Sequence, residues 1–152
     1  MDIDTAIKTI HKMAISTKTV INVMYTARYI EEAVNSVLKP YDLTIPQYNV
    51  LRILRGQKGK PANLSTIQER MVDKNSNTTR LVDKLIRKGW VKRSICETNR
   101  RKVEIVITQP GLDVLKELDP ITEDNNANIL KNLSEDQLVQ LNLLLDTLRT
   151  QY

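Results

Sequence analysis

Residues 64–91 read LSTIQERMVDKNSNTTRLVDKLIRKGWV and join two short helical patterns through a polar connection. In the first pattern, Ser65 precedes Gln68 by three residues, the spacing of an N-cap and its capping box. We expect a second helix over residues 76–88, ended by Gly89. Its inward positions would be Leu81, Val82, Leu85 and Ile86. Two short helices, the second opening with small polar residues, are typical of a helix-turn-helix.

The sequence changes character after Gly89. WVKRSIC (90–96) and KVEIVIT (102–108) are rich in β-branched residues, and the polar segment ETNRR (97–101) separates them. This pattern predicts a two-stranded hairpin with a charged tip. A thin loop that carries arginine suits the minor groove of DNA, where A·T-rich stretches concentrate negative potential.

A further helix is predicted before the pair. Thr44 and Gln47 form a capping box, Pro46 lies in the first turn, and Gly56 ends the helix. Three compact helices followed by a two-stranded wing make a winged helix-turn-helix. The expected fold class is therefore mainly α with a small β-hairpin wing.

Long helical patterns flank this unit. Residues 2–16 fit a short amphipathic helix, and an apolar stripe follows over residues 20–38 until Pro40. After the wing, Thr108 begins a helix with a kink at Pro120, and Ser134 with Gln137 caps the last helix. We interpret the chain as one domain, 1–152, with helical dimerisation regions at 1–39 and 111–152 and a DNA-binding region at 44–110.

Composition excludes several classes of protein. With 41% apolar and 27% charged residues the chain is not disordered, and no run reaches the roughly 20 apolar residues of a membrane span. We expect a cytoplasmic protein without a membrane partner. Its single cysteine and single histidine exclude an internal disulfide and argue against a Cys/His zinc site. No cofactor, metal or catalytic set is expected, so the chain is not predicted to be an enzyme.

Charge is distributed unevenly along the chain. Residues 55–102 hold 14 Lys/Arg against 4 Asp/Glu, whereas the whole chain carries only +5. A basic middle between acidic arms indicates that the middle meets a polyanion. A solvated basic face explains the charge equally well when charge is taken alone.

The candidate DNA-binding residues gather at the second helix and the hairpin tip. Arg80 is the best candidate for a bidentate contact with guanine, and Lys74 and Lys84 are placed for phosphates. The full set is Lys74, Asn75, Ser76, Asn77, Thr78, Thr79, Arg80, Lys84, Arg100 and Arg101. The alternative is that residues 76–79 only cap a helix and Arg80 is solvated. The hairpin at the right distance argues against that alternative.

Several motifs occur over residues 43–115. They are Leu43-Thr44 with Gln47, Leu64 with Gln68, TRLVDKLIRKGWV at 79–91, Asn99-Arg100-Arg101, and ITQPG at 107–111. Together they resemble the multiple antibiotic resistance regulator (MarR) family.

That resemblance implies a transcriptional regulator, usually a repressor, that binds a palindromic duplex as a homodimer and is often released by a small effector. It also implies that Arg101 enters the minor groove while residues 76–80 face the major groove. Two positions depart from the family pattern. Asn99 stands where aspartate is usual, which leaves Arg101 without a charged partner. Val72-Asp73 replaces a glycine-bearing turn.

Other residues allow two interpretations each. Tyr25, Tyr29 and Tyr48 line an effector cleft or simply pack, and Cys96 is a redox switch or, as we favour, a small strand residue. His11 is expected at the surface or in a dimer contact. Two rival functions remain: a winged-helix module that binds protein instead of DNA, and a small enzyme.

Overall fold

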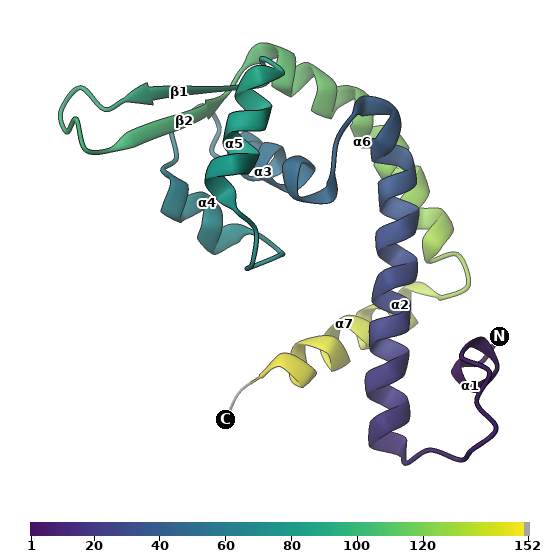
Figure 1. Ribbon diagram of the computed structural model, residues 1–152. Coiled ribbons are helices and arrows are strands. Elements are labelled where there is room, and N and C mark those ends of the chain that lie inside the picture. The colour runs from purple at the N-terminus through teal and green to yellow at the C-terminus, as the bar shows by residue number, and fades with distance from the viewer. Residues whose placement is uncertain (151–152) are drawn as a thin grey trace.

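The computed structural model describes residues 1–150 and confirms the expected fold class. The elements in chain order are α1 (Ile3–Ala6), α2 (Ile15–Leu38), the 3-10 helix η1 (Lys39–Tyr41), α3 (Ile45–Gly56), α4 (Leu64–Arg70), α5 (Thr78–Arg87), β1 (Val91–Ile95), β2 (Val103–Ile107), α6 (Gln109–Ile129) and α7 (Glu135–Arg149). Helices α3, α4 and α5 with the β1–β2 hairpin form a head, and α2 with α6 forms a stem (Figure 1).

The head is built around one apolar core. Each of its helices places at least one apolar side chain there, as do both strands. The core residues are Leu38, Leu43, Val50, Leu51, Leu54, Ala62, Ile67, Met71, Val82, Leu85, Val91, Ile105, Leu115 and Leu118. Full burial of such a side chain stabilises the fold by about 1.5–3 kcal/mol. The core therefore fixes α5 and the hairpin on the same body.

The wing is an antiparallel pair that runs from Val91↔Ile107 at its base to Ile95↔Val103 near its tip. Ala62, just before α4, forms an isolated bridge with Ile105 through bonds of 2.9 and 2.8 Å. This bridge fixes the loop between α3 and α4 to strand β2.

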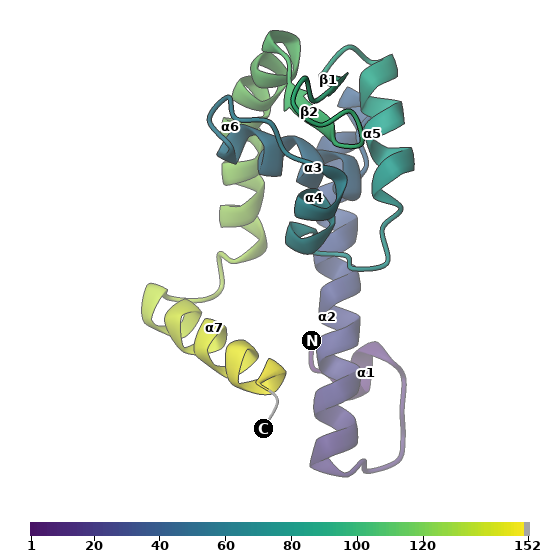
Figure 2. The same cartoon turned by 90° about the vertical axis from the view of Figure 1, so that its left-hand side faces the viewer.

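The stem leaves much apolar surface uncovered. Figure 2 shows α7 leaving the end of α6 as an arm that stands apart from α2. None of the residues of α7 is buried. The exposed apolar residues of α2 and α7 include Val20, Met24, Tyr25, Tyr29, Val139, Leu143, Leu144 and Leu148.

The expected helix over residues 2–16 is wrong in extent. Helix α1 ends at Ala6, Lys8 adopts a positive φ of 55°, and α2 begins at Ile15. Ile10, one of the apolar positions of that predicted helix, is 91% exposed. An isolated helix this short is marginal in water without packing, and only Ile3 of α1 is buried.

The predicted helix starts are confirmed in three places and shifted in two. The capping boxes Thr44–Gln47 and Ser134–Gln137 form, and the Thr108 hydroxyl caps α6. The cap of α4 is Asn63 instead of Ser65, because the Asn63 Oδ1 accepts from the Thr66 amide at 2.8 Å. Helix α5 begins at Thr78 with Asn77 as its cap, two residues later than expected. Helix α6 continues through Pro120 and curves along the stem (Figure 1).

Candidate nucleic-acid interface

The first turn of α5 presents a polar outer face. The Asn77 Oδ1 accepts from the Arg80 amide at 3.1 Å, which starts the helix and leaves the Arg80 guanidinium outside. Asn77, Thr79 and Arg80 are exposed. The opposite face buries Val82 and Leu85 in the core. The core contact therefore sets which side chains of α5 point outward.

Thr78 does not belong to that outer face. It is 7% exposed, and its hydroxyl donates to the Gln68 side chain of α4. The prediction that Thr78 faces DNA is therefore wrong. Its spacing of four from Val82 and seven from Leu85 places it on the core side of the helix, a signal that the sequence already holds. Ser76 is also turned in: its Oγ is buried without a hydrogen-bond partner among the described residues.

The turn between α4 and α5 forms without a glycine. The Asp73 carboxylate accepts from the Asn75 amide at 2.9 Å, and the Asp73 carbonyl accepts from the Ser76 amide at 3.2 Å. The Nε2 of the Gln68 side chain donates to the Lys74 carbonyl at 2.9 Å. An aspartate side chain thus supplies the local hydrogen bond that stabilises a tight turn. The Lys74 ammonium donates back to the Glu69 carbonyl and lies against the end of α4.

One face of α5 is a row of cations. Arg80, Lys84 and Arg87 line a shallow depression on the outer surface, together with Asn77, Thr79 and Asp83. The steps of four and three between the cations place them along one side of the helix. Arg87 is not among the candidates expected from the sequence. Its position seven residues after Arg80, two helical turns away, already indicates that it lies on the same side of the helix.

The wing adjoins this row. Arg93 of β1 pairs with Asp83 of α5 at 3.2 Å, and both side chains are more than 40% exposed. An exposed ion pair of this kind stabilises the folded protein by about 0–1 kcal/mol, so it contributes only weakly to the position of the wing. Neither Arg93 nor Asp83 is among the site residues expected from the sequence.

The wing tip is held by its own backbone and by Asn99. The Cys96 amide donates to the Lys102 carbonyl and the Lys102 amide to the Asn99 carbonyl, both at 2.9 Å. The Asn99 Oδ1 accepts from the Arg101 amide at 3.1 Å. Asn99 lacks the charge of an aspartate, yet its side chain still orders the chain at Arg101. Arg100 and Arg101 are both exposed.

The three tyrosines border two different cavities. Tyr25 and Tyr29 border a cavity of about 160 Å³ beside α1, whereas Tyr48 borders a separate one of about 360 Å³ between α2, α3 and α6. The Arg52 guanidinium lies over the Tyr48 ring at 5.8 Å. The choice between an effector cleft and ordinary packing for these tyrosines therefore stays a prediction.

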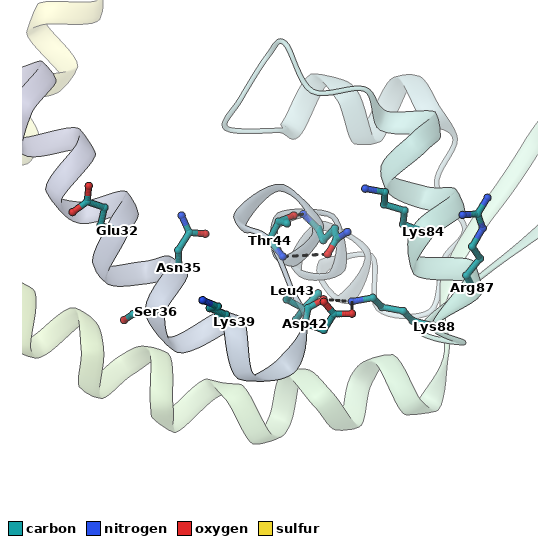
Figure 3. A pocket seen from close by; sticks show the side chains of 11 residues that line it. Glu32, Asn35, Ser36, Lys39, Asp42, Leu43, Thr44, Lys84, Arg87 and Lys88 are labelled. Carbon is teal, nitrogen blue, oxygen red and sulfur yellow. Dashed lines mark hydrogen bonds and ion pairs between the residues drawn. The ribbon is translucent and has the colours of Figure 1, made fainter.

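A larger cavity of about 920 Å³ lies between the stem and α5. Figure 3 shows Glu32, Asn35 and Lys39 on the stem side, with Lys84 and Lys88 reaching from α5 on the other. The lining contains four cations and two acids: Lys39, Lys84, Arg87, Lys88, Glu32 and Asp42. The sequence gives no sign of this cavity, because the residues of α2 and α5 that line it are more than 40 residues apart.

Cys96 lies beside the wing tip, where its amide donates to the Lys102 carbonyl. Cys96 is partly buried in the wing, with its Sγ 3.2 Å from the Thr98 hydroxyl. Within residues 1–150, no three His, Cys, Asp or Glu side chains gather as a metal-ligand group. Over the same residues, none of the helices has the length and apolar content needed to cross a membrane.

The fold and the cationic face of α5 define a winged helix-turn-helix protein that binds DNA. The model of the MarR family matches residues 43–103. The regulator PecS of Dickeya dadantii is 30% identical over 118 residues, which cover 76% of this chain and 70% of PecS. This chain belongs to the MarR family, and it is a DNA-binding transcriptional regulator, not an enzyme.

Solved structures have the same fold. A cysteine-to-serine mutant of Escherichia coli MarR in complex with operator DNA gives a TM-score of 0.76 at 23% identity, with 99% of this chain and 100% of that one covered. BpsR of Bordetella bronchiseptica, whose DNA binding is regulated by 6-hydroxynicotinic acid, gives 0.81 at 18% identity, with 93% and 100% covered.

Proposed function

We propose that this regulator is a homodimeric repressor that binds a palindromic operator and is released by a small aromatic carboxylate. The observation that carries the proposal is the row of Arg80, Lys84 and Arg87 on the outer face of α5, beside a wing whose tip exposes Arg100 and Arg101. A protein that recognises a sequence in duplex DNA needs cations that contact phosphates and a helix that contacts base edges. Both are present on one surface of this protein.

The terminal helices supply the dimer contact. Leu143, Leu144 and Leu148 of α7 are each about 60% exposed, and Val20 and Met24 of α2 are similarly open. Contiguous apolar surface of this kind marks a protein contact. A second copy of the chain covers it, through residues 1–39 and 111–152, and a twofold axis then duplicates the cationic face.

Each half-site is read by one head. Arg80 contacts a guanine in the major groove, with Asn77 and Thr79 beside it, while Lys74, Asn75 and Lys84 meet phosphates. Arg100 and Arg101 reach the adjacent minor groove. Thr78 is left out because it is buried. A dimer bound in this way covers the promoter and blocks transcription.

The effector site is the cavity between stem and α5. Its four cations exceed its two acids, so it favours an organic anion, and about 920 Å³ accommodates an aromatic ring. The regulation of BpsR by 6-hydroxynicotinic acid supports this class of ligand. An anion bound against α5 changes the position of that helix and lowers affinity for DNA.

Sequencing of genomic fragments recovered with the purified protein tests the DNA proposal. We expect inverted repeats whose half-sites are about 10 base pairs apart, centre to centre, or a multiple of that. Sedimentation of the protein alone should give a dimer. A monomer, or recovered fragments without a shared repeat, would contradict the proposal.

The effector is tested with 6-hydroxynicotinic acid as the probe, titrated into the complex with a recovered operator. We expect release, and Lys39→Met should raise the concentration needed because it removes a cation of the cavity. Lys116→Met on the exposed face of α6 is the matched control and should behave as wild type. Equal release from all three proteins would contradict this location.

A further inference from the structure

We propose that Lys88 is a positioning residue: it fixes α5 to the end of the stem, and it sets affinity for DNA without touching DNA. This inference rests on the proposed placement of α5 in the major groove. Lys88 closes α5, at the opposite end of the helix from the first turn that carries Arg80.

Two helix ends meet at Lys88. The stem turns at Asp42, which has a φ of 53°, and its amide and that of Leu43 donate back to Lys39 and Leu38 at 2.9 and 3.3 Å. Helix α5 ends in the same way at Gly89, which has a φ of 75°. Both are C-terminal turns in which a left-handed residue closes the helix.

Lys88 joins the two turns through its ammonium. The Nζ donates to the Asp42 carbonyl and lies 3.2 Å from the Asp42 carboxylate, as the dashed lines of Figure 3 show. It also lies 5.0 Å from the centre of the Trp90 ring, at the base of the wing. A cation at the C-terminal end of a helix is favoured by the helix dipole.

The Asp42 carbonyl and the Trp90 ring contribute more to this link than the Asp42 carboxylate does. The Lys88 side chain is 20% exposed, whereas that of Asp42 is 98% exposed. An ion pair with one partner in water contributes little. A hydrogen bond from a charged donor to a carbonyl is stronger and directional.

The link matters because the other directional contacts of α5 among the described residues, made by Thr78 and Asp83, lead to α4 and to the wing and not to the stem. Val82 and Leu85 hold α5 in the core by van der Waals contacts, and Lys88 adds a polar contact between the end of α5 and the end of the stem. In a dimer the stems set the distance between the two α5 helices. Without the Lys88 link, only a fraction of the dimers has both α5 helices at the spacing that DNA requires. The apparent affinity for DNA is reduced in proportion to that fraction.

Salt dependence separates positioning from direct contact. If Lys88 only positions α5, the bound state neutralises as many phosphates as before and the slope of log K against log salt is unchanged. If Lys88 contacts a phosphate, its loss lowers the slope by about 0.9 for each subunit.

The experiment measures affinity of the dimer for a recovered operator at several salt concentrations. Lys88→Met, which removes the ammonium but keeps an unbranched side chain of similar length, should weaken binding by about tenfold or more at an unchanged slope. Lys88→Arg should restore most of the affinity, and Asp42→Asn should stay near wild type because the carbonyl is retained. Lys84→Met is the matched comparison, since a phosphate contact should lower the slope.

A second measurement reads the position of α5 without DNA. A spin label at Thr79→Cys, in a Cys96→Ser background because Cys96 is the chain's one cysteine, reports the distance between the two α5 helices. We expect a narrow distribution that broadens in Lys88→Met and not in Lys88→Arg. Wild-type affinity in Lys88→Met, a lowered salt slope, or an unchanged distance distribution would overturn the inference. A wild-type protein that fails to bind any duplex would instead overturn the proposed function.

Discussion

Replacement of Arg80 by alanine is the sharpest perturbation of the proposed interface. The guanidinium is exposed on the first turn of α5 and makes no ion pair within residues 1–150. Only its backbone amide takes part in the cap of the helix, through Asn77. Alanine keeps that amide and favours the helix, so we expect stability to change by no more than about 0.5 kcal/mol.

The effect on DNA binding should be much larger. A bidentate contact between arginine and guanine is worth about 1–3 kcal/mol against the wrong base. A dimer loses two such contacts at distant and independent sites, so the total is about 2–6 kcal/mol. Since about 1.4 kcal/mol is a factor of ten, affinity should fall at least about 30-fold.

Fluorescence anisotropy with a labelled operator measures this loss, and thermal unfolding checks the fold. An operator with the guanine exchanged in both half-sites should lose affinity for the wild type and not for Arg80→Ala. Arg28→Ala is the matched control, because Arg28 is 82% exposed on the stem and pairs only with Glu31 among the described residues. Equal discrimination between the two operators by wild type and Arg80→Ala would refute the role of Arg80.

Three further predictions concern the wing, the dimer and the N-terminus. Arg101→Ala should weaken binding by about 1 kcal/mol or more on operators with A·T-rich flanks and less on G·C-rich ones, and equal losses in anisotropy would count against a minor-groove contact. Leu144→Glu should convert dimers to monomers in sedimentation, because the dimer would bury an unpaired charge, and an unchanged dimer would place the contact elsewhere. The hydrogen bond from the Thr5 amide lowers the pKa of Asp2 below its usual 3.8. The cap of α1 therefore stabilises the folded protein fully above pH 3.8, and this stabilisation is lost as the pH falls through the lowered pKa. An NMR titration of Asp2 with a pKa of 3.8 or above would show that this cap is absent.

The parts of the fold that follow from local signals could be predicted. A capping box depends on residues three apart, and both predicted boxes at Thr44 and Ser134 are confirmed. The same holds for Gly89, whose positive φ closes α5, and for the hairpin that follows it. In each case the sequence alone brings the interacting groups within reach.

The errors lie at the ends of helices and at one polar residue that is buried. The apolar spacing that includes Ile10 predicts one helix over residues 2–16, yet Ile10 is 91% exposed and no described residue covers it. Asn63 takes the place of Ser65 as the cap of α4, a shift of two residues that is within the usual uncertainty of helix boundaries. The polarity of Thr78 suggests a contact with DNA, although its helical spacing places it with the core.

The candidate site was predictable in its cations but not in its connections. Arg80, Lys84 and the arginines of the wing tip follow from the pattern of residues. The link between Lys88 and Asp42 joins residues 46 apart, and the cavity around it has walls from α2, α3 and α5. Pairings of this kind leave no periodic signal in one sequence.

The salt dependence of operator affinity, measured together with the number of subunits bound, tests the central claim most directly. Two subunits should bind one inverted repeat, and affinity should fall about a thousandfold between roughly 50 and 200 mM salt if about six or more phosphates are neutralised. One subunit per duplex, or an affinity that hardly changes with salt, would contradict a twofold cationic surface that grips DNA.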